Sequence, residues 1–263
     1  PMHDPDRIRE LARWMVEGVR SGEKAQGLHE SGTGRELEGM VLTGNLPTRN
    51  FRDGDFPYAA QISAEDILEA IGTGMEACWA CAVRCKKVVQ AESPYIIDPA
   101  YGGPEYETIA ALGSNCGVGD ANSLDTISTG VTIAFAMECF ENGLLTEEDT
   151  DGLRLTFGNG EALVAMVQKI AQREGIGDLL ADGTLAAAKK IGRGAEFYAM
   201  QVKGQEIPMH EPRFKRALAI SYAVSPTGAD HCHALHDSGL TKANEDGMLA
   251  NDTLRSLGIV EPM

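Results

Sequence analysis

Three cysteines stand close together in this sequence, at Cys78, Cys81 and Cys85, with two and then three residues between them. Thiolates bind soft metals and iron-sulfur clusters, and this spacing places three of them on one short loop. The paired Cys-x2-Cys units that are common in zinc sites have a different spacing. The triplet therefore favours an iron-sulfur cluster. Three buried free thiols, or a zinc site completed by a distant residue, are the alternatives.

The other cysteines, Cys116, Cys139 and Cys232, are isolated in the sequence. Unpaired cysteines usually behave as small buried residues, and we expect this of all three. The triplet supplies three ligands where a cluster of four irons takes four. Cys232 is the one candidate for a surrogate fourth ligand.

Carboxylates and imidazoles form a second set of candidates. Glu105 and Glu107 lie beside a glycine-rich turn, where glutamates are usually solvated. His231 is followed by His233 and His236, a pattern typical either of a metal-binding cluster or of a polar helix face. Residue type alone does not decide between these interpretations.

Hydrophobic periodicity predicts a mainly helical chain to position these residues. An amphipathic helix is expected from Pro5 to Ser21, with proline at its first position. Asp125 is the expected N-cap of a buried apolar helix that ends at Asn142. Further helices are expected at 63–77, from 146 onward, and at 159–174, 176–191 and 213–224, with an ordered loop at 32–54, a single short strand at 202–208 and a turn at 225–233.

Charge and hydropathy exclude several classes of function. The 263 residues carry a formal charge of −16, whereas phosphate binding needs clustered lysine and arginine, so we expect no nucleic-acid partner. No apolar run is long enough to cross a bilayer, and we expect no membrane partner. The N-terminal segment lacks the basic start and cleavage site of a signal peptide. These features predict a cytoplasmic protein.

Several motifs then occur in a characteristic order. They are the cysteine triplet, Gly-Pro-Glu-Tyr-Glu-Thr at 103–108, Leu-Gly-Ser-Asn-Cys-Gly at 112–117, Leu-Asp-Thr-Ile-Ser-Thr-Gly at 124–130 and Gly-Ala-Asp-His at 228–231. In this order they resemble the aldehyde ferredoxin oxidoreductase family, and the likeness extends over nearly the whole chain, including the loop at 45–51.

The resemblance implies a mainly α fold that corresponds to helical domains 2 and 3 of this family, the third in part, with the family's N-terminal β base domain absent from this chain. Residues 1–203 would form a helical domain with the cysteine cluster and the pterin and active-site loops. Residues 204–263 would begin a second helical domain that carries His231. In the family the fourth cluster cysteine lies in a later segment, beyond Met263.

The resemblance also implies the cofactors and the reaction. A tungsten-bis-pterin centre (tungstopterin), or its molybdenum counterpart, would oxidise a small aldehyde to a carboxylic acid. A [4Fe-4S] cluster on Cys78, Cys81 and Cys85 would pass the electrons to ferredoxin or to an iron-sulfur electron-transfer subunit. The chain would act as a homo-oligomer or within a larger complex.

Four residues match family positions of known role. Glu107 matches the active-site glutamate, which can act as a general base. His231 matches the residue that donates a hydrogen bond to the substrate carbonyl oxygen. Leu124 and Asp125 match the pair that contacts the pterin, where a carboxylate accepts from ring N–H groups.

Two other functions fit the same residues. One is an iron-sulfur electron-transfer or scaffold module that lacks a working tungsten site. The other is a family relative with another substrate, such as an aromatic acyl thioester or a phosphorylated aldehyde, because pocket shape sets the choice of substrate. The metal content separates the first of these from the oxidoreductase.

Overall fold

The computed structural model describes residues 5–35, 37–93, 96–116, 125–234 and 236–237. Helices predominate in these ranges and strands are few and short, as expected for a mainly α chain. Contacts group the chain into two compact units, one made of Pro1–Glu38 and Tyr58–Ile109 and the other of Gly39–Pro57 and Ala110–Met263. The domain boundary expected between residues 203 and 204 stays a prediction.

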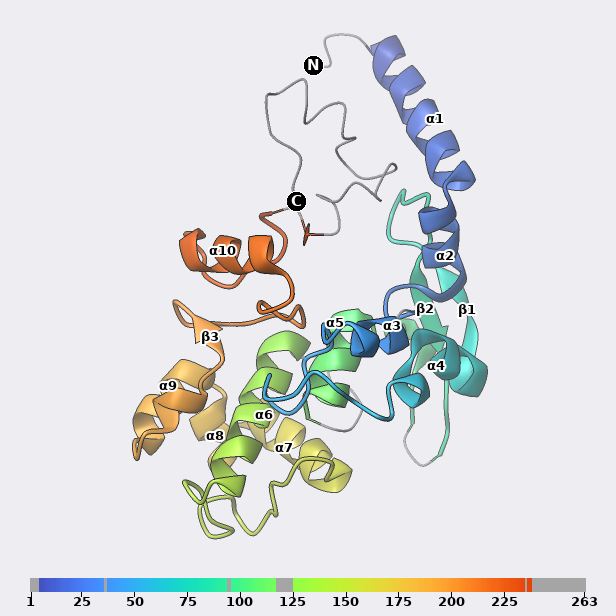
Figure 1. The fold of residues 1–263 in the computed structure, drawn as a ribbon. Coiled ribbons are helices and arrows are strands. Elements are labelled where there is room, and N and C mark those ends of the chain that lie inside the picture. Colours follow the sequence, from blue (N-terminus) through green and yellow to red (C-terminus); the bar gives the residue numbers. More distant parts are fainter. Residues whose placement is uncertain (1–4, 36, 94–95, 117–124, 235, 238–263) are drawn as a thin grey trace. The chain divides into compact units, whose positions relative to one another are not determined.

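The first unit combines helices with one small sheet (Figure 1). Helix α1 runs from Pro5 to Ser21, as predicted, and α2 (Glu23–Ser31), which was not predicted, follows it. Strands β1 (Gly72–Glu76) and β2 (Lys86–Val89) pair antiparallel. Both α2 and α4 (Ala64–Ile71) contact β1. The remaining elements of this unit are the 3-10 turns Ala60–Ile62 and Pro99–Tyr101 and the short α5 (Tyr106–Thr108).

The helix expected at 63–77 is shorter than predicted. Ser63 caps it, since its hydroxyl accepts a hydrogen bond from the amide of Asp66 at 3.1 Å. The helix ends at Ile71, and from Gly72 the chain is extended. Two glycines and a threonine at 72–74 disfavour helix, and a Cβ on Gly72 would lie 2.5 Å from the carbonyl oxygen of Leu68. The predicted helix is therefore wrong from Gly72 onward, where β1 begins.

Helix α6 (Thr126–Glu141) is the centre of the second unit. Residues 129–139 are all buried and mostly apolar, so other elements must cover the helix on every side. Those in contact with it are α7 (Gly160–Gln172), α9 (Thr184–Ile191), the 3-10 turn Ala195–Tyr198 and β4 (Gln205–Glu206). The predicted buried helix, with its cap at Asp125, is confirmed.

Other predicted elements of the second unit need correction. The helix expected at 176–191 is split into α8 (Ile176–Leu180) and α9 by Gly183, whose φ of 88° is left-handed. Thr146 and Asp149 bond to each other as expected of a cap, but they close a turn and start no helix. The strand expected at 202–208 is a tight hairpin of β3 (Gln201–Val202) and β4.

Three more elements complete the described fold. Helix α10 (Arg216–Val224) lies within the range expected for it, and α7 likewise lies within 159–174. Helix α3 (Leu37–Leu42) falls inside the segment expected to be a loop, and that prediction is wrong there. A single π-helical segment covers Ile109–Ser114.

The loop at 45–51 has an unusual backbone. Arg49, Asn50 and Phe51 all have positive φ, at 50°, 55° and 61°, and each such residue costs roughly 1–3 kcal/mol. Long-range hydrogen bonds hold the loop: the amides of Arg49 and Asn50 donate to the carbonyls of Ser114 and Asn115, each at 3.3 Å. The Asn50 side chain donates to Glu138 of α6 at 2.6 Å. The loop is therefore fixed against the core.

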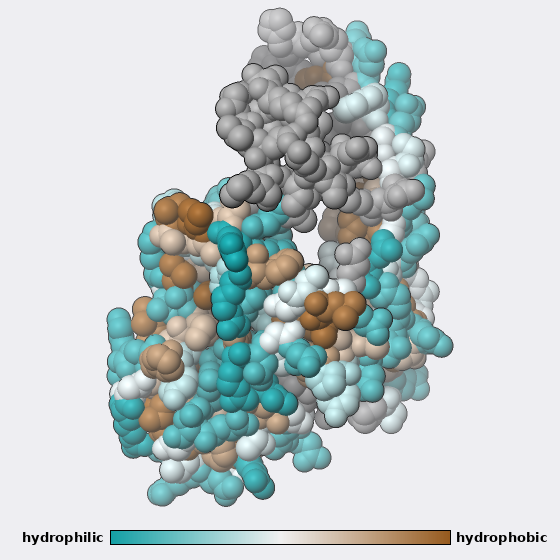
Figure 2. Space-filling view, in the orientation of Figure 1, coloured by the Kyte–Doolittle hydropathy of each residue, from teal (hydrophilic) through white to brown (hydrophobic). Residues whose placement is uncertain are grey.

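The visible coloured surface is mostly hydrophilic, with hydrophobic residues in small separate groups (Figure 2). Among the described residues, no helix combines the length and the apolar character that a membrane crossing requires.

Gly130 tests the packing around α6. A Cβ there would lie 2.7 Å from backbone atoms of Ala111, so G130A should lower the free energy of unfolding by about 1–3 kcal/mol. The control is G39A in α3, where a Cβ meets nothing within 4 Å and should be neutral or stabilising by about 0.5–1 kcal/mol. Urea unfolding measures both. Equal stability of G130A and wild type would contradict this packing.

Glu138 should make stability depend on pH. Burial, aided by the charges of Glu141 and Asp53, raises its pKa against the opposing hydrogen bond from Asn50. A carboxyl with a raised pKa contributes stability that is fully present below its unfolded pKa and is lost as pH rises through the folded one. E138Q should therefore gain stability relative to wild type as the pH rises above about 4, the unfolded pKa of a glutamate. Urea unfolding on both sides of this pH tests it, with exposed E147Q as the control for loss of one charge; a pH-independent difference would contradict it.

Candidate functional site

The cysteine triplet lies on the connection between β1 and β2. Glu76 and Lys86 pair at the base of this hairpin, with an ion pair of 3.4 Å. Within the connection the amide of Cys81 donates to the carbonyl of Cys78 at 3.0 Å, which closes a tight turn. Cys78 is exposed, and Cys81 and Cys85 are half-buried. The hairpin was not predicted from the sequence, and it is what gathers the three cysteines.

The thiols are close enough to affect one another. Burial is the main cause that raises the pKa of Cys85, followed by the charge of Glu105, and charges on Cys81 and Cys78 raise it further. Three thiolates on this loop therefore repel one another. A bound cation removes this repulsion and deprotonates coordinating thiols.

A buried lysine supports the end of this loop. The Lys87 side chain is 0% exposed, and its ammonium donates to the carbonyl of Thr33 at 2.9 Å and pairs with Glu105 at 3.3 Å. Burial lowers the pKa of Lys87 and the charge of Glu105 opposes this. A Cβ on Gly32 would lie 2.5 Å from the Lys87 ammonium and 2.6 Å from the carbonyl oxygen of Cys85. Glycine at position 32 therefore permits the close approach of the chain to Cys85.

A cavity of about 620 Å³ lies beside the cysteine loop. Cys81 lines it together with Val19, His29, Met75 and Arg84, among others. His29 is fixed by a 3.0 Å hydrogen bond between its Nδ1 and the carbonyl of Val83 on the loop. Space therefore adjoins the loop on the side of Cys81.

Glu107 lies in α5 of the first unit and is half-buried. It follows buried Tyr106, whose amide donates to the hydroxyl of Thr33 at 2.8 Å. Glu105 precedes this short helix and is held by Lys87 and Thr33. Glu105 is therefore ion-paired, and its side chain is also 42% exposed to solvent.

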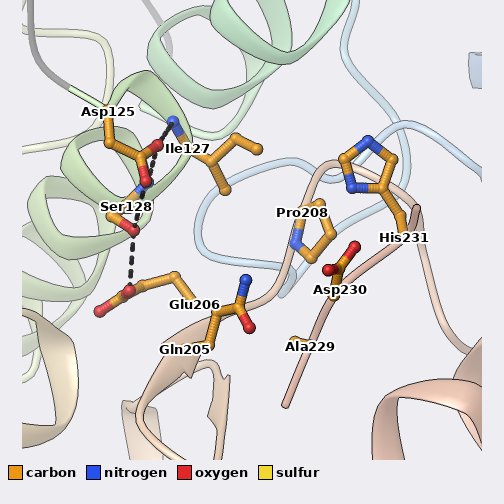
Figure 3. A pocket seen from close by; sticks show the side chains of 9 residues that line it. All are labelled: Asp125, Ile127, Ser128, Gln205, Glu206, Pro208, Ala229, Asp230 and His231. Carbon is orange, nitrogen blue, oxygen red and sulfur yellow. Dashed lines mark hydrogen bonds between the residues drawn. The ribbon is translucent and has the colours of Figure 1, made fainter. Parts of the chain in front are cut away.

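A second candidate site lies in the second unit, where Asp125 and His231 line one pocket of about 130 Å³ (Figure 3). Asp125 comes from the start of α6, and His231 from the segment after α10. Glu206 of β4 and Asp230 also line the pocket. Its charged side chains thus include three carboxylates, which suits a ligand rich in N–H donors.

Asp125 caps α6, as its position in the sequence suggested. Its Oδ1 accepts from the amides of Ile127 at 3.0 Å and Ser128 at 3.3 Å. The Ser128 hydroxyl lies 3.2 Å from the second oxygen of Asp125 and 2.9 Å from Glu206 Oε2. A hydroxyl has one proton and can donate to only one carboxylate at a time. One carboxylate oxygen can therefore accept from a ligand in the pocket.

Sequence reasoning missed Glu206 and Ser128. Glu206 is 5% exposed, and its Oε1 accepts from the amide of Thr184 at 2.7 Å, at the start of α9. Its sequence neighbours resemble an ordinary turn, and only the β3–β4 hairpin brings it to α6. No local signal could have identified it.

The segment that carries His231 is tied to both ends of α10. It leaves the helix at Ser225, whose amide donates to the carbonyl of Ser221 at 2.8 Å. It returns at Asp237, whose carboxylate accepts from the amides of Ala217 at 3.0 Å and Leu218 at 3.2 Å. His231 is therefore part of a closed loop over one helix, not of a polar helix face.

Comparison with known proteins identifies the family. Residues 10–253 match the family described as aldehyde ferredoxin oxidoreductase, domains 2 and 3. The chain belongs to the aldehyde ferredoxin oxidoreductase family. The expected fold class is thereby confirmed.

Curated relatives in this family are longer than the chain. The tungsten-containing aldehyde ferredoxin oxidoreductase of Pyrococcus horikoshii is 36% identical over 247 residues, which are 87% of this chain and 39% of that protein. The aliphatic sulfonate oxidoreductase WOR-like subunit of Pyrococcus furiosus is 34% identical over 171 residues, 58% of this chain and 27% of that one. The chain thus spans about 39% of the length of the tungsten-containing relative.

The chain also matches a solved structure, with a TM-score of 0.49 and 27% sequence identity. That structure is the active site complex BamBC of benzoyl coenzyme A reductase in complex with 1,5-dienoyl-CoA. The match covers 67% of this chain and 29% of that one.

One predicted site residue lies outside the described ranges, and one of the isolated cysteines differs from its expected burial. Leu124 lies outside the described residues. Cys116 and Cys139 are buried, as predicted, and burial raises the pKa of the Cys139 thiol to about 12. Cys232 is exposed, so the prediction that it is buried was wrong. Cys232 lies on the closed loop over α10, and its backbone amide donates a hydrogen bond to Asp230 Oδ1 at 2.6 Å.

Proposed function

We propose that the protein to which this chain belongs oxidises an aldehyde to a carboxylic acid and passes the electrons to ferredoxin or an iron-sulfur subunit. Membership of the family supports this redox chemistry. The observation that carries the proposal is the pocket that joins Asp125 to His231. These two residues match the family's pterin-contacting and substrate-contacting positions, and they come from separate segments, the start of α6 and the loop after α10.

The chemistry of the residues present suits both cofactors, with three of the four thiolates that a [4Fe-4S] cluster takes. The acidic pocket offers acceptors for the N–H groups of a pterin. They are the Asp125 carboxylate and whichever of Asp125 Oδ2 and Glu206 Oε2 does not accept from the Ser128 hydroxyl. The hairpin loop offers thiolates whose mutual repulsion a metal cluster relieves, from Cys78, Cys81 and Cys85. When bound, tungstopterin supplies a metal that takes two electrons from the substrate, and a [4Fe-4S] cluster carries them away singly.

The reaction balances with few demands on the protein. An aldehyde and water give a carboxylic acid, two protons and two electrons. The carboxylate of Glu107, which is half-buried, takes one of these protons as general base. An N–H of His231 donates to the carbonyl oxygen of the substrate, which makes its carbon more electrophilic.

The substrate is a small aldehyde in this proposal. The WOR-like relative is named for an aliphatic sulfonate, so substrates differ among the proteins similar to this chain. Turnover of aldehydes against sulfonates and aromatic acyl thioesters would assign the class.

Metal content tests the proposal as a whole. The native full-length protein should contain tungsten or molybdenum together with iron and sulfide, measured by elemental and sulfide analysis. Iron and sulfide without tungsten or molybdenum would leave only an electron-transfer or scaffold module. Zinc alone would exclude both functions.

Cluster ligation predicts the effect of one thiol. C81S in the full-length protein should lose most of the iron and the paramagnetic signal of the reduced cluster while it keeps tungsten, because the cluster loses a ligand. C139S makes the same change at a buried cysteine outside the hairpin, which is no candidate ligand, and should keep its iron. If C81S kept its full iron content, the cysteine triplet would not be the ligand set of the cluster.

Two variants test the catalytic roles. E107Q and H231N should keep their metals but lower turnover by a factor of roughly 100 or more, because each removes a proton acceptor or a carbonyl donor. Steady-state kinetics on metal-loaded protein measures this, with exposed E147Q as a control for the loss of a glutamate charge. Wild-type turnover in either variant would place that residue outside the active site.

A further inference from the structure

Lys215 is a buried lysine that contacts two imidazoles. It immediately precedes α10, is 8% exposed, and its Nζ lies 3.1 Å from His210 Nδ1 and 3.0 Å from His236 Nδ1. An ammonium has protons to donate and no lone pair to accept with. Both Nδ1 atoms must then be acceptors, and a neutral ring with an acceptor at Nδ1 carries its proton at Nε2.

The other side of His236 gives the same tautomer independently. Its Nε2 lies 3.3 Å from the backbone carbonyl oxygen of His231. A carbonyl oxygen can only accept, so Nε2 carries the proton of this ring. Burial is the main cause that lowers the pKa of His236 to about 4, so the ring is neutral near pH 7. The contacts therefore form one chain of donors, from Lys215 through His236 to His231.

His210 belongs to the same cluster. Its ring is buried, and its centroid lies 5.1 Å from the ring of His231 and 4.5 Å from that of His236. Lys215 thus fixes both rings that pack against His231. Asp237 adds rigidity, because it ties the same segment to the first turn of α10.

We propose that Lys215 is a positioning residue that holds His210 and His236 as Nε2–H tautomers and, through them, fixes the position of His231. The consequence for catalysis rests on the proposed function, whereas the tautomers do not. The sequence groups His231 with His233 and His236 and gives no local signal for Lys215 or His210. Lys215 looks like one more charged residue ahead of a helix, and only the return of the loop brings it to the histidines.

The tautomers can be measured directly. Solid-state NMR of the full-length wild-type protein, labelled with ¹⁵N only in histidine, distinguishes protonated from unprotonated ring nitrogens, and H210Q and H236Q assign the signals. We expect an unprotonated Nδ1 and a protonated Nε2 in both rings near pH 7. A proton on Nδ1 of either ring would overturn the proposal. This wild-type measurement decides even if a variant at Lys215 fails to fold.

The matched variants are K215M and K203M. Lys203 also binds this segment, because its ammonium donates to the backbone carbonyl of Ser225. K215M should lose the uniform tautomer in at least one of the two rings, and K203M should keep it in both. Retention of both tautomers in K215M would overturn the positioning role.

Kinetics separates the two proposals. On metal-loaded protein, K215M should lower kcat about tenfold or more with little change in KM, by analogy with groups that orient metal-bound histidines, and K203M should keep both values. An unchanged kcat in K215M would show that the positioning does not serve catalysis. If the tautomers are as expected but no variant or wild type oxidises aldehydes, the proposed function fails and the positioning of His231 stands.

Discussion

The second unit depends on the burial of α6 on every side. A helix with no solvent face has to be covered by its neighbours, and the closest packing leaves no room for an added atom. Gly130 shows this limit, because Ala111 occupies the space that a side chain would need. The start of the same helix carries Asp125 and Ser128 into the pocket. Core packing and pocket geometry are therefore set by one element.

The first unit depends on a buried charge. The Lys87 ammonium is satisfied by Glu105 and the Thr33 carbonyl, residues far from it in the sequence. Removing one partner of such a group leaves an uncompensated charge, which is strongly destabilising. This network joins the segment before α5 to the strand that follows Cys85. The cysteine loop and the short helix with Glu107 are in this way supported by the same interactions.

The segment from Ser225 to Asp237, which carries His231, forms a loop that closes back on α10. Both ends of α10 bind it, through Ser225 at one end and Asp237 at the other. A loop fixed at both ends loses little further entropy when it presents a side chain to a ligand. Such preorganisation is what a hydrogen-bond donor to a substrate needs, since a donor that must reorganise during the reaction stabilises charge less well.

The sequence by itself determined the family, the mainly helical fold and the candidate residues, because ordered motifs and helical periodicity are local properties. It placed α1, α6 and α7 well, and the Asp125 cap in particular. It failed at Gly72, where a helix pattern gave way to a strand whose partner is β2, since pairing between strands is not a local property. Only the tertiary structure brought Glu206 to Asp125 and Lys215 to His236. These contacts join segments distant in sequence or arise when a loop folds back, and their energies come from burial and hydrogen bonding that no short stretch of sequence contains.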